Sequence, residues 1–234
     1  MTLSSRAEHL RELMDDPECD PAKLRRTLVR FKYVNRLVSG WAAVYRSRIR
    51  PALAAAPGPV RMLDIGCGAG DVLRHLVQMA RRDGFDVEGV GIDPDARALA
   101  VAREARCVDG VSYRQTTSAR LAAEDERFDA VISNHLLHHL DAKSLERVMQ
   151  DSERLAAGIA VHSDIARSRM AYCLYSGGIL PLAPGSFLFT DGLRSIRRSF
   201  TSDELASVVP NGWKVERGGA FRLFAVRRSP GNSS

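Results

Sequence analysis

The sequence predicts an α/β fold in which a mostly parallel sheet carries helices on both faces. Between residues 60 and 164, short apolar runs typical of buried strands alternate with segments whose apolar residues recur at helical spacing. Parallel strands require such crossover helices, because the chain must return to the opposite end of the sheet before each new strand. This alternation stops at 165–199, and two short runs at 213–219 and 221–228 then indicate a closing hairpin, which brings the expected sheet to seven strands.

The individual elements follow from local patterns. Asp20 is a suitable N-cap with Pro21 at the first helical position, and helical spacing continues to Val38. A second helical pattern runs from Trp41 to Pro51, where a Pro/Gly-bounded connector begins. The other expected elements are strands at 60–66, 87–93, 111–117, 128–134 and 158–164 and helices at 71–84, 94–107, 144–157 and 201–209.

These elements divide the chain into an N-terminal helical cap, residues 1–56, and a main domain, residues 57–234, with an insertion at 165–199. Asp93 is the expected N-cap of the helix that opens with Pro94, and Thr201 and Glu204 form a capping box. Only the tail at 229–234 has the composition of a disordered segment.

Composition points to a cytoplasmic protein. No apolar run approaches the ~20 residues needed to span a bilayer, and the N-terminus lacks the apolar core of a secretion signal. The four cysteines are scattered without a CxxC pair, so neither a zinc site nor a disulfide framework is expected.

The net charge of +6 is concentrated near the N-terminus. Residues 21–50 contain nine Lys or Arg residues and no acid. A solvated helix face explains this stretch most simply, and attraction of an anionic ligand, an acidic protein or a membrane surface stays open.

A glycine-rich turn follows the first strand. Gly66, Gly68 and Gly70 form G-x-G-x-G, and Asp71 comes next. Dinucleotide enzymes use G-x-G-x-x-G with the pyrophosphate on the helix N-terminus, where an acid would repel it. No Gly-Lys-Ser/Thr follows, so the turn is not a P-loop either, and NAD and FAD are not expected.

The stretch "MLDIGCGAG" resembles motif I of the class I S-adenosylmethionine-dependent methyltransferases, which have a Rossmann-like, mostly parallel seven-stranded sheet. The resemblance implies S-adenosylmethionine as cofactor, with Asp64 orienting the methionine ammonium and Asp93, at the end of the second strand, binding the ribose. The residues expected around the cofactor are Asp64, Gly66, Cys67, Gly68, Gly70, Asp93 and Pro94.

The segment "RFDAVISNHLLHHL" resembles the fourth-strand region of the same family. It implies that Ser133, Asn134 and His135 lie on the methionine side of the cofactor. Many relatives end the third strand with an acid that binds the adenine, whereas this chain has Thr117 and Ser118 there. The resemblance covers residues 60–165 well and is weak before residue 57 and between 165 and 200.

Histidines gather where the acceptor is expected. In small-molecule O-methyltransferases that this chain resembles, a histidine of an "LHH" segment and an Asp after the fifth strand face the acceptor, which gives His138 or His139 with Asp164 as catalytic residues. A histidine base suits proton removal near neutral pH, and the alternative is that these histidines only pack while catalysis depends on proximity. No cluster has convincing metal-ligand spacing, so no metal is expected.

The insertion at 165–199 is rich in apolar and aromatic residues and is expected to cover the substrate. The expected acceptor contacts are His162, Tyr172, Tyr175 and Phe187. A dimer contact is the alternative role of this segment, and the chain is expected to be a monomer or a homodimer.

The resemblance therefore implies methyl transfer from S-adenosylmethionine to a hydroxyl of an apolar, aromatic or polyketide-like small molecule, as in secondary metabolism. Carbon methylation of a phenol or quinone, nucleic-acid methylation and a non-enzymatic cofactor-binding subunit are the alternatives. The motif Asn/Asp-Pro-Pro-aromatic of enzymes that methylate base amino groups is replaced by "SNHLLH", which argues against a nucleic-acid partner.

Overall fold

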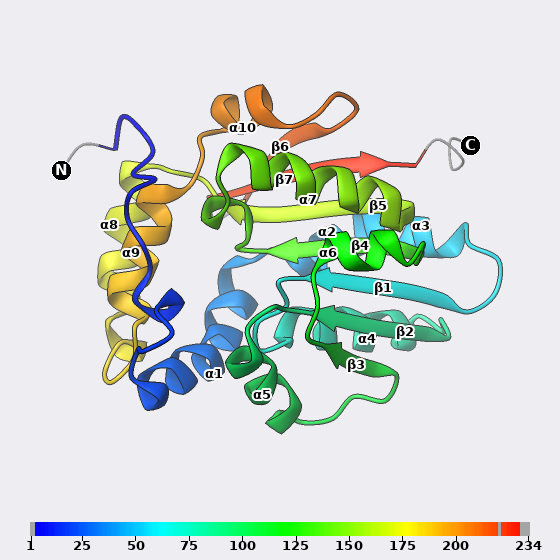
Figure 1. Ribbon diagram of the computed structural model, residues 1–234, viewed down its shortest axis with the longest axis horizontal. Coiled ribbons are helices and arrows are strands. Elements are labelled where there is room, and N and C mark those ends of the chain that lie inside the picture. The colour runs from blue at the N-terminus through cyan, green and yellow to red at the C-terminus, as the bar shows by residue number, and fades with distance from the viewer. Residues whose placement is uncertain (1–2, 220, 230–234) are drawn as a thin grey trace.

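The protein, described here by a computed structural model for residues 3–219 and 221–229, is built on one seven-stranded sheet (Figure 1). The strand order is β3-β2-β1-β4-β5-β7-β6; β1 to β5 are parallel, and β7 is antiparallel to both β5 and β6. The predicted mostly parallel sheet with a closing hairpin is confirmed. The strands are β1 Val60–Ile65, β2 Val87–Ile92, β3 Val111–Arg114, β4 Phe128–Asn134, β5 Ala156–Ile165, β6 Lys214–Gly218 and β7 Arg222–Arg228.

Helices cover both faces of the sheet, and a further group stands at the carboxyl ends of β1 and β4 (Figure 1). That group comprises α1, α8 and α9, which therefore lie at the edge where ligands of open α/β sheets bind. The helices are α1 Pro21–Val38, α2 Trp41–Val44, α3 Arg50–Ala54, α4 Asp71–Arg82, α5 Ala96–Glu104, α6 Ser118–Ala123, α7 Ala142–Leu155, α8 Arg169–Gly178, α9 Leu188–Arg198 and α10 Ser202–Val208. Short 3-10 turns occur at Leu13–Asp15, Leu137–His139 and Leu180–Leu182.

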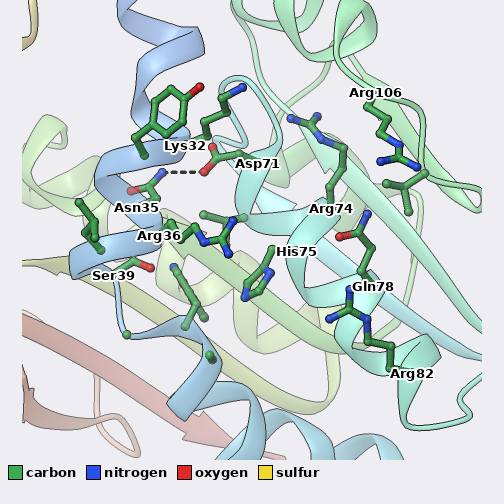
Figure 2. Close-up of a pocket in the computed structure, with 17 residues that line it drawn as sticks. Lys32, Asn35, Arg36, Ser39, Asp71, Arg74, His75, Gln78, Arg82 and Arg106 are labelled. Atoms are coloured by element: carbon green, nitrogen blue, oxygen red, sulfur yellow. Dashed lines mark hydrogen bonds between the residues drawn. The ribbon is translucent and has the colours of Figure 1, made fainter. Parts of the chain in front are cut away.

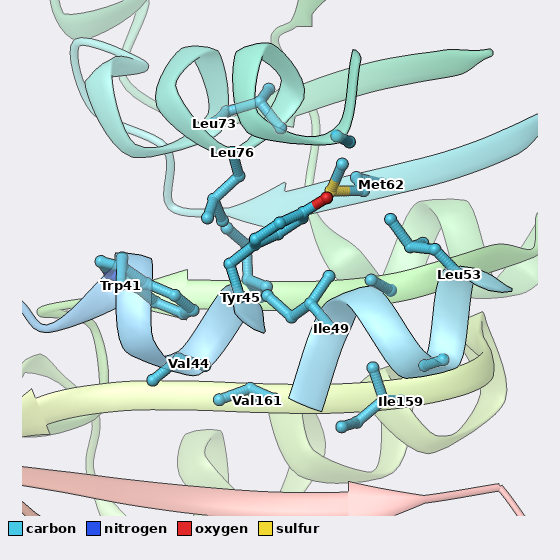
Figure 3. Packing of buried hydrophobic residues seen from close by; sticks show 14 of the residues in the cluster. Trp41, Val44, Tyr45, Ile49, Leu53, Met62, Leu73, Leu76, Ile159 and Val161 are labelled. Carbon is cyan, nitrogen blue, oxygen red and sulfur yellow. The ribbon is translucent and has the colours of Figure 1, made fainter. Parts of the chain in front are cut away.

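The core has two apolar layers, one on each face of the sheet. On one face, α4 packs with the segment 41–54 against β1, β4 and β5 (Figure 3). Trp41, Tyr45 and Ile49 are each at most 2% exposed in this layer. On the other face, α6, α7 and α10 contribute Leu121, Met149 and Leu205.

The domain boundary expected at residue 56 does not match a break in this packing. Residues 41–54 belong to the sheet's own core, because their apolar side chains fill the space between α4 and the strands. The prediction that the helix ends at Pro51 and a connector begins there is wrong, because Pro51 lies within α3. The helix continues through a π-helical turn at Tyr45–Ile49 into α3, so Pro51, which follows that turn as the second residue of α3, does not end it.

Helix ends follow the predicted chemistry with one exception. Asp20 caps α1 and the capping box of Thr201 and Glu204 caps α10, as expected. The N-cap of α5 is Asp95, whose carboxylate accepts from the Arg97 amide, and not Asp93. The expected disordered tail lies outside the described residues apart from Ser229.

The insertion at 165–199 forms α8, a 3-10 turn and α9. The N-terminal segment lies against α9, because the amides of Leu13 and Met14 both donate to the Asp191 carboxylate, at 2.8 and 3.0 Å. Within the described ranges, none of the helices combines the length and apolarity that a membrane crossing requires.

Candidate active site

A cavity of about 620 Å³ lies at the carboxyl ends of the parallel strands. The glycine turn after β1 and the end of β2 form one wall. The opposite wall comes from α1, α8, α9 and the N-terminal segment at Glu12, Met14 and Asp15. The cavity therefore joins the predicted cofactor residues to the predicted cover.

The three glycines of the turn share a backbone conformation but differ in what they contact. All have positive φ, at 67°, 53° and 68° for Gly66, Gly68 and Gly70, which only glycine adopts without strain. Gly66, Cys67 and Gly68 line the cavity. Gly70 is not part of that lining; a Cβ there would lie 2.3 Å from the Tyr113 hydroxyl, so this glycine permits close packing of α4 on β3.

Two carboxylates beside the turn fit a cationic ligand that carries a ribose. Asp64 lines the cavity and is 1% exposed, and its Oδ1 has no hydrogen-bond partner among the described residues. Burial, with Asp71 and Asp93 nearby, raises the pKa of Asp64, so an ammonium at this point would satisfy an otherwise unpaired acceptor. Asp93 accepts from the amides of Gly68 and Asp95, at 3.0 and 2.9 Å, and these bonds fix its carboxylate at the cavity.

Arg222 of β7 organises the end of β4. Its guanidinium donates to Asn134 Oδ1 at 2.6 Å, to Ser163 Oγ at 2.6 Å and to His135 Nε2 at 2.9 Å. Burial lowers the pKa of Arg222 to about 10, and burial together with this guanidinium lowers the pKa of His135, so His135 is a neutral acceptor. Asn134 and His135 both line the cavity, as the sequence predicted, while Ser133 instead bonds His162 inside the sheet.

His138 lies between two buried carboxylates. Its Nδ1 is 2.7 Å from Asp164 Oδ1, its Nε2 is 3.2 Å from Glu12 Oε1, and its amide donates to Asp164 Oδ2. Burial opposes a charge on the ring, but Asp164 and Glu12 outweigh it and raise the pKa of His138 to about 9. Burial likewise opposes the charge on Glu12, yet His139 and His138 lower its pKa to about 2. His138 is therefore protonated near neutral pH, with both ring nitrogens engaged.

His139 is the more accessible of the two adjacent histidines. Its side chain is 26% exposed against 1% for His138, and its ring lies 4.3 Å from the His138 ring between centroids. His139 Nδ1 is 3.3 Å from Asp15 Oδ2, and Nε2 is 3.6 Å from Glu12 Oε1. Both distances leave His139 less tightly held than His138 at the cavity wall.

Glu12, His138 and His139 also form a set of metal donors, because their ligand atoms lie within 4.8 Å of one another. Imidazole and carboxylate donors suit divalent transition metals. The ion pairs of His138 account for the same geometry without a metal, and the absence of a metal stays a prediction.

The structure brings only part of the predicted site together. The expected residues that line the cavity are Asp64, Gly66, Cys67, Gly68, Asp93, Pro94, Asn134, His135, His138, His139 and Tyr175.

The other expected contacts lie elsewhere. His162 is fully buried between Ser133 Oγ and the Trp213 ring, because it lies further back along β5 than Asp164. Ser118 donates to Asp151, and neither it nor Thr117 belongs to the cavity lining. Phe187 packs with Leu24 and Ala98 in a separate apolar cluster, and Tyr172 is outside the lining.

Glu12 and Arg222 also line the cavity, and sequence reasoning missed both. Glu12 belongs to an acidic N-terminal stretch with no motif, so no local signal distinguishes it. Arg222 stands in the apolar run "FRLFAV" of a predicted strand, and a charged residue at such a position is a usable signal because it needs a buried partner.

Comparisons with known proteins show what part of the chain is similar to. Residues 62–157 match the family model described as "Methyltransferase domain". The chain is similar to a ubiquinone biosynthesis O-methyltransferase of Roseobacter denitrificans, with 35% identity over 126 residues that cover 51% of this chain and 48% of the relative. The match thus spans about half the length of that curated relative.

Solved structures show the same fold. A SAM-dependent methyltransferase from Aquifex aeolicus superposes with a TM-score of 0.58 and 15% identity over 90% of this chain and 99% of the other. The plantazolicin methyltransferase in complex with SAH gives a TM-score of 0.53 and 12% identity over 88% and 96% of the two chains. Residues 62–157 are therefore similar to a methyltransferase domain, and the chain has the fold of S-adenosylmethionine-dependent methyltransferases.

Proposed function

We propose that the chain methylates a hydroxyl of an apolar, aromatic or polyketide-like small molecule. One observation carries this proposal: a single cavity joins the carboxylates suited to the methyl donor with a partly exposed histidine. Bound beside Asp64 and Asp93, S-adenosylmethionine supplies an electrophilic methyl group. A hydroxyl acceptor then has to lie in line with it, about 3 Å away, and lose its proton.

The acceptor side of the cavity supports an apolar substrate. Helix α8 and its C-cap contribute Leu174, Tyr175 and Ile179, while α9 contributes Ile196 and α1 contributes Phe31. Apolar walls with a few fixed polar groups are typical of small-molecule sites. The similarity to a protein named for ubiquinone biosynthesis O-methylation, although partial, agrees with a ring hydroxyl as the acceptor.

Within this proposal, His139 takes the acceptor's proton. Its ring lines the cavity and is 26% exposed, and Glu12 and Asp15 lie within 3.6 and 3.3 Å of its nitrogens. His138 and Asp164 act as positioning residues, because their mutual bonds fix the 3-10 turn that carries His139. This assignment refines the prediction that either histidine acts with Asp164.

Carbon methylation of a phenol or quinone is the second candidate. The same proton removal would create a phenolate, whose ring carbon can attack the methyl group instead of its oxygen. The cavity favours neither the phenolate oxygen nor the ring carbon, so analysis of the products has to distinguish the two reactions.

The experiment is a methyl-transfer assay with S-adenosylmethionine and a panel of phenols from catechol to a prenylated hydroquinone. We expect transfer to at least one phenol, with the new methyl resonance of the product assigned to oxygen by NMR. A product with the new methyl group on a ring carbon would contradict O-methylation and support carbon methylation, the second candidate. Methylation of RNA or DNA with no phenol accepted would overturn the small-molecule proposal.

A further inference from the structure

A second cavity lies on the other side of α1 from the active site. This basic groove, of about 610 Å³, is formed mainly by α1, the segment 39–42 and α4, with Arg106 and Val108 at one end (Figure 2). It shares Asn35, Leu37, Asp71 and Val72 with the active-site cavity, so α1 is the wall between the two.

The lining of the basic groove is dominated by positive charge. Lys32, Arg36, Arg74, Arg82 and Arg106 line it, and Asp71 is its acid. Asp71 accepts a hydrogen bond from Asn35 at 3.0 Å, so this carboxylate is already engaged at the α1 wall of the groove.

Three of these guanidiniums have no partner among the described residues. Within the part of the chain that the structure describes, Arg36, Arg82 and Arg106 make no hydrogen bond or ion pair. Other arginines do find acids: Arg61 bonds Glu88 and Glu126, and Arg114 bonds Glu124 and Glu126. Glu88, Glu124 and Glu126 are thus not part of the groove lining, which contains five Lys or Arg residues and one acid, Asp71.

His75 also lies close to the positive charges of the basic groove. Its ring lies between α1 and Gln78 in the groove (Figure 2). Burial, followed by Arg36 and Arg82, lowers the pKa of His75, so both guanidiniums act on the space that this ring faces. Gln78 adds an amide that can donate to the same space.

The shape and donors of the groove select a ligand class. Several guanidiniums around one hollow match a doubly charged group with three or more acceptor oxygens better than a single carboxylate, which one arginine can satisfy. A concave site of this volume is typical of a small ligand and not of an extended polymer. We propose that the basic groove binds a phosphate or diphosphate group, carried by a soluble small molecule or by a lipid headgroup, through Arg36 and Arg82.

Calorimetry with inorganic pyrophosphate at about 150 mM salt, an ionic strength that screens loose surface attraction, tests this proposal. The test variant is the double substitution Arg36→Gln and Arg82→Gln. The matched control is Arg25→Gln with Arg120→Gln, which removes the same charge from exposed arginines paired with Glu104 and Glu124. Thermal unfolding monitored by circular dichroism establishes that both variants fold.

We expect the wild type and the control to bind pyrophosphate alike and the test variant, which loses two charged hydrogen-bond donors, to bind about a hundredfold more weakly or worse. A parallel arm measures cosedimentation with phosphatidylglycerol and phosphatidylcholine vesicles. Retention on the anionic vesicles alone that requires Arg36 and Arg82, without pyrophosphate binding, supports the site and assigns the phosphate to a lipid.

Three outcomes overturn the proposal. The wild type binds neither probe, the control variant loses as much affinity as the test variant, or mixed-sequence single-stranded RNA binds far more tightly than pyrophosphate and independently of Arg36 and Arg82. The readout is binding alone, so it does not depend on whether the chain methylates a phenol.

Discussion

At the scale of single residues, burial decides which titratable groups can do chemistry. His138 and His139 are neighbours of the same type, yet one lies between Asp164 and Glu12 and the other opens to the cavity. The sequence could place both histidines near the acceptor but could not separate them, because the separation depends on Glu12, which lies 126 residues away along the chain.

Replacing each histidine separates a base from a positioning residue. His139→Ala should reduce turnover of an accepted phenol by roughly 10²–10⁴-fold, the usual contribution of a positioned base, with donor affinity nearly unchanged. His138→Ala should instead lower the melting temperature, because it leaves Asp164 and Glu12 buried without their cation. Steady-state kinetics and thermal unfolding measure the two effects. Normal turnover in His139→Ala would mean that His139 is not the base and that catalysis depends on proximity and desolvation alone.

The paired carboxylates make stability depend on pH in a predictable window. The pKa of His138 rises from 6.5 in the unfolded chain to about 9 in the fold, so its contribution is complete below pH 6.5 and is lost as the pH rises through 9. The loss is on the order of 3 kcal/mol. Denaturant unfolding between pH 6 and 10 should show this decline in the wild type and in the control His9→Gln, and a flatter profile in His138→Gln. Parallel profiles for all three proteins would show that His138 is not the titrating group.

At the scale of elements, local rules predicted the strands, most helices and the caps, because these depend on residues close in sequence. Pro51 and Asp95 are the instructive exceptions. Pro51 resembles a helix end in the sequence, but the helical run continues past it from the π-helical turn at Tyr45–Ile49, and Ala52 and Leu53 lie in the core. Asp95 and not Asp93 caps α5, since Asp93 is occupied by the amides of Gly68 and Asp95.

The glycine turn offers a prediction at this scale. Gly70→Ala should lower the melting temperature more than Gly68→Ala, because a Cβ at Gly70 meets the Tyr113 ring whereas one at Gly68 meets no atom within 4 Å. Gly68→Ala should mainly weaken binding of S-adenosylmethionine, since Gly68 lines the cavity. Thermal unfolding and calorimetry on both variants check this division. It fails if Gly68→Ala proves the less stable protein and Gly70→Ala the weaker binder.

At the scale of the whole molecule, the site joins segments that are far apart in sequence. The wall at the glycine turn could be predicted from the sequence, because its residues lie in one motif and at the ends of neighbouring parallel strands. The acceptor half was predicted less well. His162 is buried at Trp213 and Phe187 in another cluster, since their surroundings are set by how α1, α9 and β6–β7 pack and not by local sequence.

The central claim is that the cavity beside the glycine turn binds S-adenosylmethionine through Asp93. Isothermal titration of S-adenosylmethionine into the wild type, Asp93→Ala and the exposed control Asp109→Ala tests it most directly. We expect binding by the wild type and the control, and a loss of about 1–3 kcal/mol in Asp93→Ala, the usual effect of removing a charged hydrogen-bond partner. Undiminished affinity in Asp93→Ala, or no binding by the wild type, would contradict the account.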